Sequence, residues 1–344
     1  MKEHWAEYQD FMGHKRVHES AAVWTIYHAI DSETANPFQA YQATRYIDTA
    51  IPHIPVTAHG LKENGYATIA TTNWLPYSWS VNNIAFAEVM HTALSYFQAG
   101  RAEAGYKLLK SSVLDGMYLG DSPGNFGQIS FYDAARGECY RDFGDPIGVA
   151  SRVLIQGLFG ILPDALNQQI ILRPGFPDDW DKASVSTPDI SYRFTRKEDT
   201  DTYHIAQRFQ TPLHPVLQIN ARKEKIRSVK VNGVPATWQS IESAHGYPLL
   251  SIQAEGTSST TITIEWEGAS LHTLAVQELV IASNGKLALQ IPSGASISQV
   301  YDPQSVLAKH TVEATAFNAQ LKGEPGHHTF FVYTHQGEMD WWQP

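Results

Sequence analysis

The spacing of apolar residues changes once along the chain, near residue 170, and this change most constrains the fold. Before it, apolar side chains recur every three or four residues, as in amphipathic helices. The runs that predict helices are 18–30, 81–100, 102–116 and 146–162. After it, apolar and polar residues alternate in short runs separated by turns such as Asn232-Gly233, which predicts antiparallel strands. The sequence therefore predicts a mixed fold, an all-α region of helical hairpins followed by an all-β sandwich.

The change of period coincides with a run rich in proline and glycine, LRPGFPDDWDKA, at 172–183. We expect helical hairpins over 1–170, a connector over 171–183 and a β-sandwich over 184–344. The first residues, MKEHWAEYQDF, lack the apolar segment of a signal peptide and look like the middle of a helix. We therefore expect a chain cut from a longer protein.

Composition excludes several classes of protein. Of 344 residues, 43% are apolar and 17% are charged, which suits two well-packed domains and argues against disorder. The net charge of -10 argues against nucleic-acid binding, because phosphates are bound by clustered Lys and Arg. No run approaches the roughly 18 apolar residues of a membrane span. Cys139 is the only cysteine, so an intrachain disulfide is impossible and the cellular compartment stays undetermined.

Residues 137–150, GECYRDFGDPIGVA, combine carboxylates with aromatic side chains just before a predicted helix. Asp145 precedes Pro146, so it is expected to cap that helix. Glu138 has no capping role at this spacing. Held beside Tyr140, its carboxylate is a candidate general base that activates a water molecule.

Other interpretations of this stretch stay open. Glu138 could instead form a salt bridge with Arg136 or Arg141. Asp142 is the second candidate carboxylate for catalysis. The single thiol is not favoured as a nucleophile, since no histidine partner with a defining spacing is present.

A second stretch, TTNWLPYSWSVNN at 71–83, resembles a sugar subsite in its residue types. Trp74 and Trp79 offer flat apolar faces, and Asn82 offers an amide for hydroxyl groups. The alternative is an aromatic-packed helix entry with Ser80 as its N-cap.

Two histidines have the spacing that metal ligands show on a helix. His14 and His18 stand four residues apart, but the glutamate of an HExxH zinc motif is missing between them. We expect neither a metal site nor another cofactor.

The order of the elements carries a resemblance. Predicted helices, then GLFGILPDALNQQIILRPGFPDDW, then a sandwich resemble the C-terminal part of six-hairpin glycosidases, which are (α/α)6-barrel glycoside hydrolases and phosphorylases. Residues 71–183 carry this likeness in sequence. Within the superfamily the chain looks closest to Bacteroidota proteins with the domain named DUF4450. The resemblance implies a carbohydrate substrate and a periplasmic or secreted full-length protein.

Part of 137–150 is similar to trehalases of that superfamily, in which a Glu-Tyr pair precedes an Asp-Gly-Phe-Gly-Trp run. Their glutamate is the general base, which by resemblance implies this role for Glu138. Cys139 replaces the tyrosine, Asp145 replaces the tryptophan, and one glycine is missing. Phosphorylases bind phosphate near this helix with Thr, Ser and Gly. Only Gly148 and Ser151 remain here, so hydrolysis is favoured over phosphorolysis.

The sequence thus predicts part of a glycoside hydrolase of inverting mechanism, with Glu138 as general base and Asp142 in reserve. The residues expected to shape the sugar site are Trp74, Trp79, Asn82, Tyr140 and Arg152. The predicted helices make up about half of a complete barrel, so the general acid is expected upstream. A missing barrel half or a second copy should then cover the exposed apolar face. A non-catalytic carbohydrate-binding or structural module and a phosphorylase are the alternatives.

Overall fold

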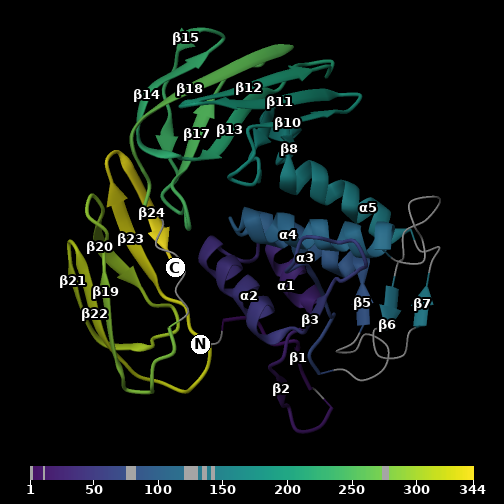
Figure 1. Cartoon of the computed structure of the whole chain (residues 1–344), viewed down its shortest axis with the longest axis vertical. Coiled ribbons are helices and arrows are strands. Elements are labelled where there is room, and N and C mark those ends of the chain that lie inside the picture. The colour runs from purple at the N-terminus through teal and green to yellow at the C-terminus, as the bar shows by residue number, and fades with distance from the viewer. Residues whose placement is uncertain are drawn as a thin grey trace. The chain divides into compact units, whose positions relative to one another are not determined.

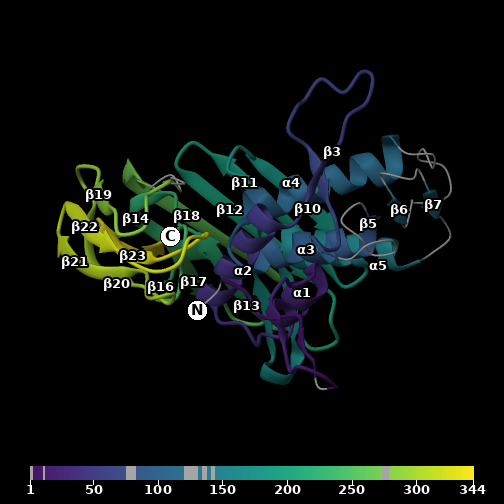
Figure 2. The same cartoon turned by 90° about the horizontal axis from the view of Figure 1, so that it is seen from below.

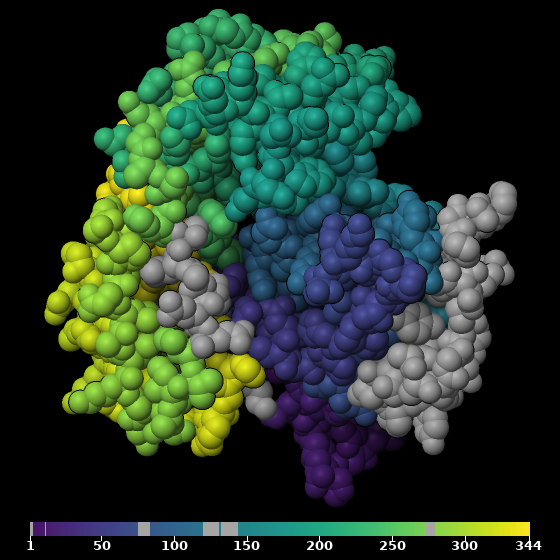
Figure 3. All heavy atoms as spheres, viewed as in Figure 1, coloured from purple at the N-terminus to yellow at the C-terminus, as the bar shows by residue number. Residues whose placement is uncertain are grey.

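The computed structural model describes residues 3–10, 12–74, 83–119, 131–133, 138–140, 144–272 and 279–344, the coloured parts of Figures 1 and 3. The chain divides after Leu158 into two compact units. The first carries the helices and the second is built from strands, so the fold is mixed and rich in strands.

The helical unit has five α-helices in its described residues. They are α1 (Val23–Asp31), α2 (Pro37–Ala50), α3 (Phe86–Gln98), α4 (Ala102–Val113) and α5 (Asp145–Arg152). Two π-helical segments continue the last two of them, η1 (Leu114–Leu119) and η2 (Val153–Leu158). None of the helices in the described ranges is long and apolar enough to cross a membrane.

Short strands connect these helices in three small sheets. The pairs are β1 (Tyr8–Gln9) with β2 (Val17–His18), and β3 (His53–Pro55) with β4 (Ala67–Ile69). The third sheet has the order β5 (Asn83–Ala85), β6 (Phe131–Asp133), β7 (Glu138–Tyr140). Figures 1 and 2 both show this third sheet beside α5.

Three expectations about local structure were wrong. The described part of 1–11 is not helical, because β1 pairs with β2. The helix expected from residue 81 begins at Phe86, because β5 pairs with β6. The helix expected over 146–162 becomes π-helical at Val153, and the chain then turns at Gly160 with φ of +65°. Strand pairing between distant segments, which helical spacing does not encode, explains the first two.

The hairpin of α3 and α4 has the expected glycine at its turn. Gly100 has φ of +74°, a left-handed conformation that glycine adopts without steric cost. Its N–H donates to the Phe97 carbonyl at 3.0 Å, and the Arg101 N–H donates to the Tyr96 carbonyl at 2.8 Å. These two bonds satisfy the last carbonyls of α3 and end it sharply.

Phe97 of α3 lies between two glycines of neighbouring segments. A Cβ atom on Gly157 would lie 2.6 Å from the Phe97 ring, and one on Gly105 would lie 2.9 Å from it. Because the ring is buried, it has little room to move. We expect Gly157→Ala to lower the free energy of unfolding by about 1–3 kcal/mol, the usual cost of overpacking. Urea denaturation measures this, with Gly148→Ala, where an added Cβ meets nothing within 4 Å, as the control.

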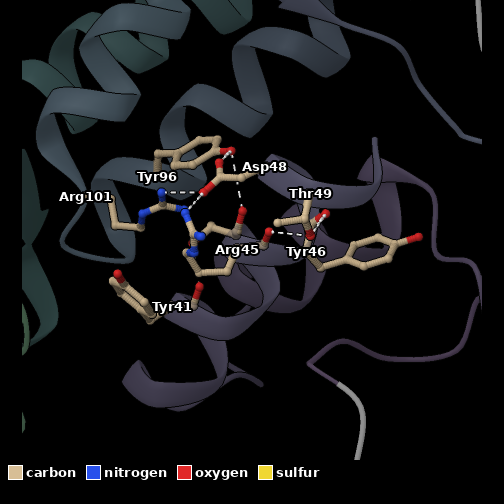
Figure 4. Close-up of polar contacts among 8 residues, drawn as sticks. Tyr41, Arg45, Tyr46, Asp48, Thr49, Tyr96 and Arg101 are labelled. Carbon is tan, nitrogen blue, oxygen red and sulfur yellow. Dashed lines mark hydrogen bonds and ion pairs between the residues drawn. The ribbon is translucent and has the colours of Figure 1, made fainter. Parts of the chain in front are cut away.

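A buried ionic network ties α2 to the end of α3 (Figure 4). Asp48 accepts hydrogen bonds from Arg45 at 2.7 Å, from Arg101 at 2.6 Å and from the Tyr96 hydroxyl at 2.5 Å. The Arg101 guanidinium lies over the rings of Tyr96 and Tyr41, 4.8 and 5.3 Å from their centroids. These contacts hold α2 against the end of α3.

The β unit begins with two large sheets. One has six strands: β10 (Lys182–Ser186), β11 (Ile190–Lys197), β12 (Thr200–Gln207), β18 (Ser259–Ser270), β14 (Lys223–Val231) and β15 (Val234–Pro235). The other has five: β16 (Gln239–Ser240), β17 (Leu249–Gln253), β13 (His214–Asn220), β9 (Gln169–Leu172) and β8 (Ile161–Asp164). Asn232-Gly233 forms the predicted two-residue turn, between β14 and β15.

Two smaller sheets complete this unit. They are β19 (Lys286–Gln290), β22 (Ala316–Leu321) and β21 (Leu307–Glu313), and β20 (Ser296–Tyr301), β23 (Phe331–Gln336) and β24 (Met339–Gln343). A shared apolar core, which includes Leu287, Ile297, Phe317 and Val332, joins the two. The strand region thus contains more than the single sandwich expected, β8 precedes the predicted connector, and β9 runs into its first two residues. β9 pairs in parallel with β13, which alternation along one strand cannot reveal.

Candidate functional site

The predicted general base lies on the third small sheet of the helical unit. Glu138 opposes Asp133 of β6, which opposes Asn83 of β5. β5 runs directly into α3, and α5 begins shortly after β7. The sheet therefore connects the segment that leads into α3 with the strand that carries Glu138, and β6 lies between them. Glu138 and Tyr140 are placed by their strand and its register alone.

Three other predicted site residues, Asp142, Trp79 and Asn82, lie outside the described residues. Trp74 is half-buried, and its ring lies against the His18 ring with centroids 4.2 Å apart. Its indole N–H is buried and has no hydrogen-bond partner among the residues that the structure describes.

Arg152, predicted to contact sugar, is engaged with a carboxylate. Its two terminal nitrogens donate to Asp31 at 2.6 and 2.8 Å, and its Nε donates to Gln156 at 2.7 Å. Gln98 of α3 donates to the same Asp31 at 2.9 Å. Burial alone would raise the pKa of Asp31, but the hydrogen bonds from Arg152 and Gln98 outweigh it and lower that pKa. The pair joins α1 to α5.

Sequence analysis missed Glu88, in the first turn of α3. Its carboxyl is largely buried and forms a hydrogen bond with the Tyr27 hydroxyl. Its Oε2 atom has no partner within the described part of the chain. Burial raises the pKa of Glu88, and the charge of Asp145 raises it further, against the hydrogen bond from Tyr27 and the charge of His28. The neutral carboxyl is thereby favoured over a wider pH range.

His91 stands one turn further along α3. Its ring stacks on Tyr27 with centroids 4.6 Å apart and an interplanar angle of 13°. Burial lowers the pKa of His91, and the charge of Arg152 lowers it further, while Asp31 acts in the opposite direction. We use the name Glu88 cluster for the six residues of α1, α3 and α5 that these interactions join: Tyr27, Asp31, Glu88, His91, Asp145 and Arg152.

The expected capping role of Asp145 was wrong. Helix α5 begins at Asp145, its N-cap is Gly144, and no side chain caps it. A carboxylate inside the first turn is still stabilised by the positive end of the helix. Asp145 instead acts on Glu88 through its charge.

A sequence signal for the missed residues exists in hindsight. Glu88 and His91 are three apart in FAEVMHTALSYF, so they share one face of a helix that is otherwise mostly apolar. Titratable side chains on such a helix are rarely buried without a function or a partner.

The Glu88 cluster contains carboxyl and imidazole groups, the residue types that acid–base catalysis uses. It holds one carboxyl whose pKa is raised and one whose pKa is lowered, which is how a protein separates the roles of acid and base. No group of three or more potential metal ligands occurs in the described ranges.

Comparison with known proteins finds only distant likeness. The chain matches no family model and no curated protein. Among solved structures, an α-L-rhamnosidase from Dictyoglumus thermophilum is similar over 53% of this chain and 21% of its own, with 11% identity and a TM-score of 0.35. A protein described as a glycoside hydrolase is similar over 94% of this chain and 65% of its own, with 11% identity and a TM-score of 0.32. The chain thus spans less than two thirds of either neighbour, and both neighbours are glycoside hydrolases.

Proposed function

We propose that this chain is the C-terminal part of a glycoside hydrolase that cleaves a glycosidic bond with inversion. The observation that carries the proposal is the Glu88 carboxyl, buried, bonded to Tyr27 and raised in pKa beside Asp145. A general acid in a glycosidase must be protonated at the working pH in order to protonate the leaving oxygen. The raised pKa of Glu88 favours the protonated form, which makes Glu88 the proposed general acid, whereas the sequence alone suggested an acid further upstream.

Glu138 is the proposed general base, with Asp142 in reserve. Adjacent strands lie roughly 4.8 Å apart, so β5 and β7 are separated by about 10 Å across β6. Inverting glycosidases hold their two carboxyl groups about 6.5–9.5 Å apart, with a water molecule between base and sugar. Glu88 follows β5 by three residues and Glu138 lies on β7, so the proposed acid and base come from segments that the same small sheet connects.

The remaining predicted site residues take positioning and binding roles in this proposal. Trp74, Trp79 and Tyr140 would stack on sugar rings, and Asn82 would bond a hydroxyl. Arg152 would act through Asp31, since it donates two hydrogen bonds to that carboxylate. The second copy or missing barrel half, the periplasmic or secreted location and the narrower likeness to Bacteroidota proteins stay predictions.

A panel of oligosaccharides tests the proposal. The chain, and any longer natural protein that contains it, is assayed for reducing-sugar release beside Glu138→Gln, which removes the base while keeping its shape. We expect turnover to fall about a hundredfold. The matched control is Glu33→Gln, an exposed acid in the turn after α1. Undiminished turnover in Glu138→Gln would remove Glu138 from the mechanism.

The same panel distinguishes the alternatives. Sugar release that requires added phosphate would identify a phosphorylase. Binding of an oligosaccharide without release, in the longest natural form of the protein, would identify a non-catalytic module.

A further inference from the structure

A cavity of about 360 Å³ lies in the β unit, in the size range of small-ligand sites. Residues of the connector, of the strands β11 to β14 and of the segment before β17 surround it. Its charged lining residues are Arg196, Arg222, Lys223 and Asp178. Positive groups therefore outnumber negative ones in the wall.

One buried carboxylate holds the two arginines in place. Asp201, 1% exposed, accepts hydrogen bonds from Arg196 Nε and Arg222 Nη1, both at 3.0 Å. Trp266 Nε1 donates to its other oxygen at 3.1 Å. Because a single carboxylate neutralises only one of two guanidiniums, the pair keeps a net positive charge.

The arginines retain donors for a ligand. Beyond Asp201, Arg196 donates to the Asp178 carbonyl and Arg222 to the Glu198 carbonyl, at 3.0 and 3.1 Å. Each guanidinium has five N–H donors, and these contacts use about half of them. A planar guanidinium with free N–H donors can bind both oxygens of a carboxylate at once. Lys223, which pairs with Asp199 at 2.8 Å, adds a flexible charge.

The cavity also has an aromatic part. Phe176 is half-buried and stacks on Phe194, with centroids 5.4 Å apart and an angle of 22°. The half-buried Tyr247 lines the cavity as well, and its hydroxyl donates to Asp178 at 3.1 Å. A ligand here meets basic donors beside aromatic side chains, and the Phe176 ring is already stacked on Phe194 and Trp180.

We propose that this cavity binds the carboxylate of an acidic sugar, a uronic acid unit, in the β unit. The carboxylate part of the inference stands on Arg196, Arg222 and Lys223. The sugar part rests on the proposed function. Binding is measured without catalysis. A lack of galacturonate binding would therefore not contradict the hydrolase proposal, and a lack of hydrolysis would not contradict a carboxylate site in the β unit.

The test is calorimetric titration of the whole chain with galacturonate, galactose, acetate and inorganic phosphate. We expect galacturonate to bind at least about tenfold more tightly than galactose or acetate, and more weakly as salt rises. Arg222→Lys keeps the charge that Asp201 needs but loses the planar guanidinium, and Lys223→Gln removes a partly buried charge. Each should weaken galacturonate binding about tenfold. Lys230→Gln, on the same strand as Lys223 and paired with Glu265, should leave it unchanged, since Lys230 does not line the cavity.

Several results would overturn the proposal. If galactose binds as tightly as galacturonate, the carboxylate has no role in binding. If acetate binds as tightly as galacturonate, the sugar ring has none. Tighter binding of phosphate would make this a phosphate site. Unchanged affinity in both variants, with folding verified by urea denaturation, would move any observed binding to another part of the chain.

Discussion

Replacing Glu88 with glutamine is expected to lower kcat by about 10²–10⁴-fold on the glycan that the panel identifies, because the general acid is lost. The fold should persist, since glutamine keeps the size of the side chain and can still accept the hydrogen bond from Tyr27. Steady-state kinetics measures the effect, with Glu33→Gln as the matched control. A Glu88→Gln variant with unchanged kcat would show that the acid lies elsewhere.

Stability gives a second measurement on the same variant. The pKa of Glu88 is raised in the folded protein, so the folded state holds its proton to higher pH than the unfolded state does. The stability that this carboxyl contributes is present below its unfolded pKa and is lost as pH rises through the folded value. Glu88→Gln removes this loss. We therefore expect the variant to be no less stable than wild type at pH 8, even though its activity falls.

Asp145→Asn should shift the pH profile of activity. The charge of Asp145 raises the pKa of Glu88, so its removal lowers that pKa. An acid with a lower pKa loses its proton at lower pH, and the basic limb of the kcat profile should move in that direction. A profile that does not move, or moves to higher pH, would contradict the assignment of Glu88 as the acid.

Asp201→Asn is expected to destabilise the protein by about 3–5 kcal/mol, the cost of breaking a buried ionic network by removing one partner. The variant leaves Arg196 and Arg222 half-buried without their shared carboxylate, and it weakens the bond from Trp266. Urea denaturation followed by tryptophan fluorescence measures the loss, because Trp266 is itself buried.

Asp199 provides the matched control two residues earlier. It also pairs with a cation, Lys223, at 2.8 Å, but its side chain is 57% exposed. Exposed pairs contribute about 0–1 kcal/mol, so Asp199→Asn should have little effect on unfolding. Equal losses in the two variants would mean that burial does not set the contribution of Asp201.

The local pattern of the chain was enough to predict much of the secondary structure. The helical period around residues 86–98 and 102–113, with Gly100 between them, yields the hairpin of α3 and α4. Strand alternation and Asn232-Gly233 yield β14 and its turn. These features depend on residues near one another in the chain, and the sequence displays such neighbours directly.

The proposed site was harder to predict, because its members come from separate segments. Glu138 was noticed for its neighbours, but Glu88 was passed over inside an apolar helix. Its importance depends on Tyr27 of α1 and Asp145 of α5, which reach it only in the folded chain. Arg152 was expected to be free for sugar, and its partner Asp31 lies far away in the sequence.

By itself, the sequence determined the helices α1, α3 and α4, strands such as β14 with its turn, and which carboxylates stand near aromatic residues in the chain. Only the tertiary structure decided that β5 and β7 flank β6, that burial raises the pKa of Glu88, and that Asp201 binds two arginines. The reason is physical: period and turn chemistry are local, whereas burial, charge coupling and strand register arise from contacts between distant segments.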